Sequence, residues 1–566
     1  MKEPTRQTDF INNHNINNII NNINYKNQTA SVDINTREES ERETVTPIHI
    51  PKETRNILNN LEKAGYEAWC VGGCVRDALL GVRPDDWDVT TNATPDEMRQ
   101  VFKTRAIPTG LKHGTMTIRS GADTGIEVTT YRLDGDYTDH RRPDCVTFTD
   151  SLKEDLRRRD FTINAIALNL RGELYDPYHG QEDLKAGILR CVEDPDRRFQ
   201  EDALRIMRGL RFAAVLSRPA ADISNDISDA VLSNPAADSS DDISDALSKS
   251  ADKIILNNNF HNLDKNADIL ETQSAISEDK NINNNKLFKI APETADAIRR
   301  NRDLLLHIAP ERIWTELYKL TGGEYAVPVL RQFPDVIGVF WPEILPMIDF
   351  DQKNKHHCYD VWEHTLHALD ALNDFETPFR QDIILKFALL LHDIGKPATC
   401  TTAPDGQRHF YGHPAKSREI AEIMLKRLKT PNIFRERVLN LIEQHDRPIP
   451  ATEREIRRLL TKLDPEDTKR LFDLKRADNL AQSPAYRERQ AQLDQAVILL
   501  RDVLERDDCF SLKQLAVNGH DMQKLGLRGP EIGDMLKILL ERVINGDLIN
   551  HHDILINFAR DSIQTR

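Results

Sequence analysis

Residues 71–88 read VGGCVRDALLGVRPDDWD, where a glycine pair and an Arg-Asp dipeptide precede two aspartates spaced one residue apart. Gly72 and Gly73 remove side-chain bulk so that backbone N–H groups can approach an anion, and Arg76 adds charge at the start of a helical stretch. In a strand over DWDVTT, Asp86 and Asp88 would share one face and bind one or two Mg²⁺ ions. An isolated pair of this kind is more often a solvated turn, so the downstream sequence decides.

Two further segments extend this pattern. IEVTTYR, at 126–132, alternates like a strand and brings Glu127 toward the same sheet, where it is either a third carboxylate of the site or a structural residue. RRRDFTINAIALNL, at 157–170, places Arg159, Asp160 and Asn164 next to an apolar run. A basic cluster is usually a solvated face, but one that abuts a buried segment favours ligand contact.

The segment DPDRRFQEDALRIMRGLRFAA, at 194–214, predicts a helix that begins near Phe199. Arg205, Arg208 and Arg211 recur every three residues and would share a broad face with Asp202, one turn earlier. Such a row of charged groups suits a triphosphate and a base edge. A surface pair between Glu201 and Arg205 would explain only part of the row.

GGxVRD, DxD, RRDFTINA and EDxLRxxRxxRF, in this order, resemble the class II tRNA nucleotidyltransferase and bacterial poly(A) polymerase family. The resemblance implies template-independent extension of an RNA 3′ end by two-metal nucleotidyl transfer. It implies that Asp86 and Asp88, with Glu127, form the catalytic centre with Mg²⁺. The nucleotide would be bound by Gly73, Arg76, Arg159, Asp160, Asn164, Asp202, Arg205, Arg208 and Arg211. Asp202 and Arg205 would face the base, Arg159 and Asp160 the ribose, and Arg208 and Arg211 the triphosphate.

A second set of motifs lies toward the C-terminus. His364, His392-Asp393, His413, His445 and Asp478 each lie in or beside a helix-like segment. A single histidine there is more often a core residue, but imidazoles and carboxylates together are what a hydrolytic metal site needs. The segments resemble the HD phosphohydrolase superfamily. That resemblance implies a first metal on His364, His392, Asp393 and Asp478, and a second on His413 and His445, the ion being a transition metal or Mg²⁺. The module is either an active phosphohydrolase of RNA ends or nucleotides, or is retained for RNA binding and packing.

We therefore expect an α+β protein, with a mixed-sheet head followed by an all-α neck, body, HD domain and tail. The expected parts are an Asn-rich disordered N-terminus (1–47), the head (48–171), the first part of the neck (172–216), a disordered acidic insertion (217–286), neck and body helices (287–350), the HD domain (351–480) and a tRNA-binding tail (481–566). In the tail, Gly526, Gly529 and Gly533 would break or begin helices near an RNA backbone, or the tail merely closes the domain. The polar stretch 132–148 is predicted to be a mobile loop that helps to switch base choice, or an ordinary connector.

The net charge of −15 is unusual for an RNA enzyme, but it is unevenly distributed. Residues 217–286 hold 13 acidic against 6 basic residues, a net charge of −7, and contain a tandem repeat that starts at Ala220 and again at Ala236. This composition is typical of a disordered insertion. Seven cysteines without a CxxC pair, and no apolar stretch near the roughly 20 residues of a membrane span, predict a cytoplasmic protein without membrane contact.

The leading hypothesis is CCA addition to tRNA, with CTP and ATP as substrates. A poly(A) polymerase or an enzyme that adds only the terminal A shares the same motifs. The chain could also be chiefly an HD phosphohydrolase whose head docks RNA, but a binding module would not need Asp86 and Asp88. A nucleotide-sensing regulator is disfavoured by the number of reactive groups. The oligomeric state cannot be derived from these patterns.

Overall fold

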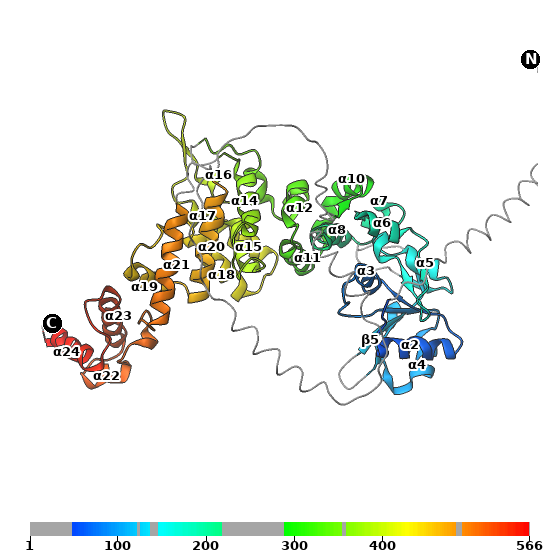
Figure 1. The fold of residues 1–566 in the computed structure, drawn as a ribbon, viewed down its shortest axis with the longest axis horizontal. Coiled ribbons are helices and arrows are strands. Elements are labelled where there is room, and N and C mark those ends of the chain that lie inside the picture. Colours follow the sequence, from blue (N-terminus) through cyan, green and yellow to red (C-terminus); the bar gives the residue numbers. More distant parts are fainter. Residues whose placement is uncertain are drawn as a thin grey trace, which may run out of the picture. The chain divides into compact units, whose positions relative to one another are not determined.

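The structure is a computed structural model that describes residues 48–120, 125–135, 145–217, 288–353, 358–482 and 489–564 (Figure 1). The predictions for 1–47, for 218–286 and for the middle of the 132–148 stretch fall outside the described residues. Within the described part, a mixed sheet belongs to the N-terminal region and helices dominate the rest. The α+β fold class is confirmed.

The head contains a seven-stranded sheet in the order β3-β4-β5-β2-β1-β8-β9. Its strands pair antiparallel except for β2 and β5, which are parallel. The bounds are β1 Ala68–Val71, β2 Val89–Thr91, β3 Ala106–Gly110, β4 Thr115–Arg119, β5 Gly125–Thr130, β8 Ala167–Leu168 and β9 Leu174–Tyr175. The sheet thus continues past residue 171, where we expected the head to end. Strands β6 Arg132–Asp134 and β7 Val146–Phe148 form a hairpin from the two ends of the 132–148 stretch.

The two faces of the sheet are covered differently. Helices α2 (Lys52–Lys63) and α4 (Pro95–Phe102) pack on one face, where Val89 and Val128 join their core. Helix α4 begins with a capping box between Thr94 and Glu97, as the sequence TPDE favours. Helix α5 (Leu152–Arg157) packs on the opposite face with Val71. Because side chains alternate along a strand, the residue before Val89, Asp88, faces the side of α5.

The neck is assembled from both sides of the insertion. Strand β10 (Ile188–Leu189) pairs in parallel with β11 (Lys289–Ile290). The backbone N–H of Phe288 donates to the Ser217 hydroxyl over 2.8 Å. The chain therefore leaves and re-enters the neck at adjacent points. The neck helices are α6 Gly180–Ala186, α7 Pro195–Glu201 and α8 Leu204–Leu216, whereas α3 Gly73–Leu79 belongs to the head and joins its core through Cys74 and Val75.

The helix predicted to begin near Phe199 is in fact two helices. Helix α7 ends at Glu201, and α8 begins at Leu204. Asp202 lies between them in an extended conformation and accepts the backbone N–H of Leu204. A short carboxylate that caps the following turn competes with a continuous helix, which explains the break.

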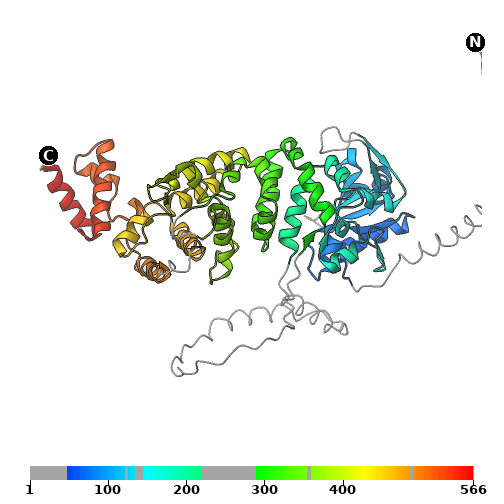
Figure 2. The same ribbon diagram turned by 90° about the horizontal axis from the view of Figure 1, so that it is seen from above.

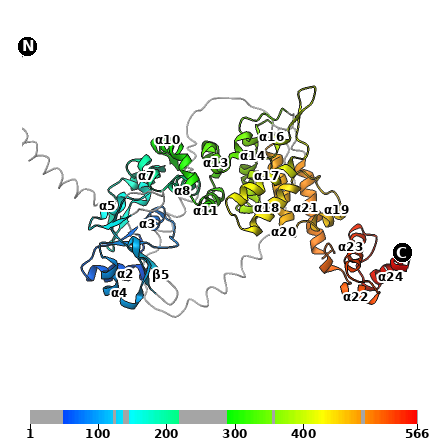
Figure 3. The ribbon, with the colours of Figure 1, turned by 180° about the vertical axis from the view of Figure 1, so that it is seen from behind.

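Helices of the body and of the HD domain share one hydrophobic core with the neck. Figures 2 and 3 show these helices from two further sides. The body comprises α10 Pro292–Asn301, η4 Arg302–His307, α11 Pro310–Gly322, α12 Ala326–Gln332, α13 Pro334–Phe340 and η5 Pro342–Met347. The HD region comprises α14 Val361–Asp370, α15 Ile383–Leu391, α16 Lys396–Thr399, the hairpin of β12 Thr401–Thr402 and β13 Arg408–His409, α17 His413–Arg427, α18 Asn432–Gln444, α19 Glu453–Leu460, α20 Pro465–Leu480 and α21 Arg489–Glu505.

The tail has a separate core made by α22 (Gly519–Lys524), α23 (Pro530–Asn545) and α24 (His552–Gln564). Gly526 and Gly529 adopt positive φ values of +92° and +54° in the turn between α22 and α23, as expected of helix-breaking glycines. The same expectation for Gly533 is wrong, because this residue lies inside α23. None of the helices that the structure describes is long and apolar enough to span a membrane.

Candidate functional site

The three carboxylates of the head lie at one end of neighbouring strands. Asp86 and Asp88 precede β2 rather than lying in it, since the strand begins at Val89. The prediction of a strand is therefore wrong for residues 86–88. The side chains still alternate, because Trp87 is buried whereas Asp86 and Asp88 are exposed. Val89 pairs with Val128, which brings Asp88 opposite Glu127 on the parallel strand β5.

The electrostatics of Asp88 fit a cation site. Its carboxyl pKa is raised, first by partial desolvation and then by the charges of Asp86 and Glu127, while Arg159 acts in the opposite direction. Neighbouring carboxylate groups repel one another, and a divalent cation, for which oxygen ligands are suited, relieves that repulsion. The donor set therefore fits Mg²⁺.

Arg159 reaches these carboxylates over the glycine pair. A Cβ on Gly72, whose φ is +84°, would lie 2.8 Å from a terminal nitrogen of Arg159. Within the described residues, the buried Arg159 Nε has no hydrogen-bond partner. Its neighbours in the RRRD segment have other partners: Arg157 pairs with Glu193 and Arg158 with Asp155. Arg159 is the one of the three arginines whose charge lowers the pKa of Asp88. It therefore lies where it could contact a ligand of the carboxylate site.

A chain of hydrogen bonds connects the head to helix α8. Arg76 donates to the Asn164 side chain over 2.8 Å, and Asn164 donates to Asp160 over 3.0 Å. The other oxygen of Asp160 accepts from Arg208 Nε over 2.8 Å. Burial alone would raise the pKa of Asp160, but Arg208 and Asn164 hold it well below its usual range. Asp160 is therefore anionic and orients Arg208.

Phe212 is a site residue that the sequence patterns did not reveal. The guanidinium groups of Arg76, Arg208 and Arg211 lie 5.0, 5.3 and 4.0 Å from the centre of its ring. An aromatic face attracts cations, so Phe212 gathers three arginines from two elements. Its place directly after Arg211, four residues after Arg208, is the signal that could have identified it.

Helix α11 supplies counter-charges to the neck. Glu316 accepts from Arg211 Nε over 2.6 Å, and both side chains are largely buried. One turn earlier, Arg312 contacts the Asp202 carboxylate over 3.3 Å. Sequence patterns missed both residues, because they follow the long insertion.

The pair predicted to read the base has partners within the protein. Arg205 is buried and donates to the carbonyls of Arg198 and Arg158 and to the Glu201 carboxylate. Asp202 and Arg205 are not one turn apart on one helix, because the chain breaks at Asp202. They remain adjacent at the start of α8. Gly73, which was also predicted to contact the nucleotide, is the first residue of α3.

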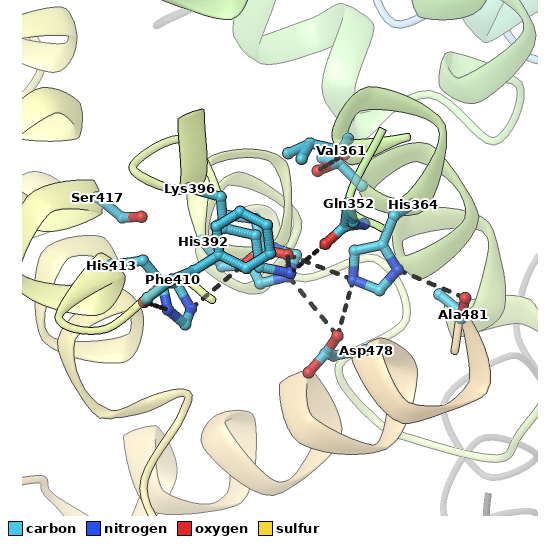
Figure 4. A network of polar contacts seen from close by, with 12 residues as sticks. Gln352, Val361, His364, His392, Lys396, Phe410, His413, Ser417, Asp478 and Ala481 are labelled. Atoms are coloured by element: carbon cyan, nitrogen blue, oxygen red, sulfur yellow. Dashed lines mark hydrogen bonds and ion pairs between the residues drawn. The ribbon is translucent and has the colours of Figure 1, made fainter. Parts of the chain in front are cut away.

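The HD region brings together all six predicted ligands. Figure 4 labels four of them, His364, His392, His413 and Asp478. Asp393 lies at the centre. One of its carboxylate oxygens is 3.1 Å from His392 Nε2 and 3.4 Å from His364 Nε2. The other is 3.4 Å from His413 Nε2 and 3.7 Å from His445 Nε2. Asp478 completes the first group at 2.9 Å from His364 Nε2.

The backbone orients the four imidazoles alike. Nδ1 of His392, His413 and His445 lies 2.7, 2.9 and 2.6 Å from the carbonyl oxygen three residues earlier. Nδ1 of His364 lies 3.4 Å from the Ala481 carbonyl. If each Nδ1 donates its proton there, each Nε2 presents a lone pair to Asp393. The Nε2 atoms of His413 and His445 are 3.1 Å apart, and two facing lone pairs require a cation between them.

Two buried polar atoms of this cluster are held by charge alone. Among the described residues, His392 Nε2 and Asp393 Oδ2 form no hydrogen bond of good geometry, although they lie 3.1 Å apart and Oδ2 lies 2.6 Å from Lys396 Nζ. Burial would lower the pKa of His392, but the charges of Asp393 and Asp478 raise it to about 10. The carboxylates of Asp393 and Asp478 thus favour a positive charge between them, and a bound metal ion would supply that charge. Two groups have metal-binding geometry, His364–His392–Asp393 and Asp393–His413–His445.

Lys396 and Gln352 surround this centre. Lys396 is buried, with Nζ 2.6 Å from Asp393 and 3.0 Å from the Gln352 side-chain oxygen. It therefore neutralises a metal ligand rather than pointing into solvent. Gln352 has no motif in the sequence and was missed.

Comparison with known proteins agrees with these sites. The family model "Poly A polymerase head domain" matches residues 68–190, "Probable RNA and SrmB- binding site of polymerase A" matches 287–334, and "HD domain" matches 355–483. Both the head and the HD domain imply the use of divalent metal ions.

Curated relatives carry the name CCA-adding enzyme. The protein of Oceanobacillus iheyensis is 53% identical over 160 residues, which is 28% of this chain and 40% of the relative. That of Levilactobacillus brevis is 51% identical over 172 residues, which is 30% of this chain and 43% of the relative. The matched segment thus spans less than half the length of these relatives.

Solved structures share the fold over most of the chain. The CCA-adding enzyme of Bacillus stearothermophilus in complex with CTP has a TM-score of 0.58 at 24% identity, covering 91% of this chain and 98% of that one. The Thermotoga maritima CCA-adding enzyme complexed with tRNA has a TM-score of 0.50 at 16% identity, covering 91% and 97%. The chain thus contains regions that match the poly(A) polymerase head domain and the HD domain, and its fold is similar to that of CCA-adding enzymes.

Proposed function

We propose that this protein adds C, C and A to tRNA 3′ ends without a nucleic-acid template, using CTP and ATP and releasing pyrophosphate. The observation that carries the proposal is the identity of 51–53% to proteins named CCA-adding enzymes. The convergence of three carboxylates and four arginines where the head meets α8 provides the chemistry. The matched segment is 160 residues long, so the choice of CTP and ATP rests on the chemistry of the site residues.

In this proposal, Asp86 and Asp88 hold Mg²⁺, and Glu127 adds a third carboxylate beside Asp88. When bound, two such ions stabilise the attacking 3′-hydroxyl oxygen and the leaving pyrophosphate oxygen. Arg159 contacts the sugar or α-phosphate above Gly72. Arg76, Arg208 and Arg211 neutralise the triphosphate, held in place by Asp160, Phe212 and Glu316. Most of the catalytic effect would come from such positioning and charge stabilisation.

Asp202 and Arg205 select the base. A carboxylate accepts from the exocyclic amino group of cytosine or adenine, whereas uracil and guanine present a carbonyl at that position. Base binding would compete with the contact of Asp202 with Arg312 and with the protein acceptors of Arg205. Nucleotide binding is thereby coupled to a small rearrangement at the junction of α7 and α8.

Asp202→Asn tests this selection. The amide offers a donor where the carboxylate accepts, so we expect the ratio of kcat/KM for CTP over UTP to fall about tenfold or more, the size of one hydrogen bond to a charged group. Asp296→Asn, an exposed change on α10, is the matched control. Unchanged discrimination in Asp202→Asn would locate base reading elsewhere.

We also propose that the HD centre is a metal-dependent phosphohydrolase of RNA ends or nucleotides. His364, His392, Asp393 and Asp478 would hold one ion, and Asp393, His413 and His445 a second. The excess of imidazole favours a transition metal over Mg²⁺. Such an ion lowers the pKa of a bound water and supplies hydroxide for cleavage of a phosphate ester.

Metal content tests this second centre without relying on its activity. After exchange into Mn²⁺ and gel filtration, the wild type is expected to retain two equivalents in the HD centre, and His413→Ala one. Equal retention in both proteins would reject the second ion. Retention of none would reject the centre. Nucleotide addition by His413→Ala is expected to equal that of the wild type.

The expected partners are tRNA, CTP and ATP, and the expected location is the cytoplasm. All seven cysteines are free, which fits a reducing compartment. Poly(A) addition, or addition of the last A alone, remains the alternative within the family, and the identity of the added nucleotides distinguishes the three.

A further inference from the structure

The inference concerns a cavity beside the HD centre and rests on the hydrolase proposed for that centre. A cavity of about 410 Å³ is lined on one side by His445 and Asp478. The Asp478 side chain is 20% exposed, whereas the side chains of His364 and His392 are fully buried. The cavity is thus a route by which a ligand reaches the metal-binding carboxylates.

The lining also contains three cationic residues. Arg447 follows α18, and Arg489 begins α21; both side chains are exposed and line the cavity. Lys475 of α20 is the third and donates to the backbone carbonyls of His445 and Arg447. Asp446 is the one acidic residue of the lining apart from Asp478.

The two arginines of the cavity have no carboxylate partner in the part of the chain that the structure describes. Some other arginines of the HD region do, as Arg437 has Asp464 and Arg476 has Asp494. Among the described residues, the side chains of Arg447 and Arg489 form no ion pair within 4.0 Å, although each is close enough to affect the Lys475 ammonium. Two guanidinium groups kept together without carboxylate partners, at the rim of a cavity, suit a phosphate group.

We propose that Arg447 and Arg489 bind a second phosphate of the HD substrate, distinct from the phosphate at the metal centre. The ligand is then a nucleotide with phosphates at both ends of its ribose, and not a simple phosphomonoester. A 3′-phosphorylated RNA end and a free nucleoside 3′,5′-bisphosphate share this chemistry. The cavity volume of about 410 Å³ suits one nucleotide.

Binding provides the first test. The double variant Asp86→Ala/Asp88→Ala, chosen to weaken nucleotide binding in the head, serves as the background. It is titrated calorimetrically with adenosine 3′,5′-bisphosphate and with adenosine 3′-monophosphate in Mn²⁺. Introducing Arg447→Ala or Arg489→Ala into this background is expected to weaken binding of the bisphosphate about tenfold or more and to leave binding of the monophosphate unchanged, because each removes one charge-assisted contact. Arg454→Ala, an exposed arginine of α19 outside the cavity, is the control. Equal binding of the bisphosphate by all variants would overturn the proposal.

Kinetics separate this inference from the proposed hydrolase. With p-nitrophenyl phosphate, which has one phosphate, Arg447→Ala should keep the wild-type KM. With adenosine 3′,5′-bisphosphate its KM should rise about tenfold or more at unchanged kcat. If no substrate is hydrolysed, the hydrolase proposal fails and the calorimetric comparison still decides the phosphate site. A greater loss for a 3′-phosphorylated trinucleotide than for the bisphosphate would identify RNA as the source; an equal loss would identify the free nucleotide.

Discussion

Replacing Glu316 by alanine tests how the body helix α11 supports the nucleotide site. Glu316 Oε2 lies 2.6 Å from Arg211 Nε, and the two side chains are 9% and 15% exposed. Burial lowers the pKa of Arg211 and Glu316 counters that effect, so the carboxylate offsets part of the cost of burying this charged guanidinium. Arg208 and Arg76 lie on the same ring of Phe212, so loss of Glu316 also leaves three like charges together.

The magnitude follows from the burial of the pair. Removing one partner of a buried ion pair costs about 3–5 kcal/mol, because the other charge is left without compensation. Glu316→Gln keeps a neutral acceptor and should cost about 1–2 kcal/mol, the difference between a charged and a neutral hydrogen bond. Replacing both partners, as in Glu316→Leu/Arg211→Met, should cost less than Glu316→Ala alone.

Hydrogen exchange followed by mass spectrometry reports this effect locally, which suits a chain with more than one core. In Glu316→Ala, the most protected amides of α8 and α11 should exchange about 100-fold faster or more. Peptides from α23, which belongs to the separate core of the tail, serve as an internal reference. Asp303→Asn, at a side chain that is 80% exposed, should change nothing.

Two outcomes would refute the reasoning. The first is an exchange rate in α8 that Glu316→Ala leaves within twofold of the wild type. The second is a double variant whose loss equals the sum of the single losses, since a direct ion pair requires the two changes to be coupled.

The remaining predictions concern the metal site, the insertion and pH. Asp88→Asn should abolish nucleotide addition while thermal unfolding and HD metal content stay unchanged; joint loss would indicate misfolding. Deleting residues 218–286 should preserve addition, because Ser217 and Phe288 already share a hydrogen bond; a folded but inactive product would contradict this. Burial lowers the pKa of Lys386 to about 8, so unfolded chains bind more protons above that pH, and stability should rise up to about pH 10.4. In Lys386→Met, denaturation midpoints should lose this rise; an identical pH profile would show that Lys386 carries no such penalty.

Local patterns were sufficient for the parts of the fold that depend on local forces. The alternation around Val128 predicted β5, and the Thr-Pro-Asp-Glu capping pattern marks the start of α4. The HD ligands were predicted because an adjacent His-Asp pair and further histidines resemble the HD superfamily. The structure places His392 and His445 directly after α15 and α18, and His413 at the start of α17.

What the sequence did not predict depends on long-range partners. The break between α7 and α8 arises because Asp202 caps Leu204 and contacts Arg312, which follows it by 110 positions. The ion pair of Arg208 with Asp160 and that of Arg211 with Glu316 likewise join segments far apart in the chain. Residue spacing predicted that these arginines bind a ligand but could not show that acidic partners fix their orientation.

The most direct test of CCA addition is to incubate the protein with Mg²⁺, CTP and ATP and a tRNA transcript that ends at the discriminator base, and then to sequence the 3′ ends. The account predicts products that end in CCA and stop there, and none with Asp88→Asn. Addition of A alone to transcripts ending in CC, a long A tail, or no extension at all would each contradict it.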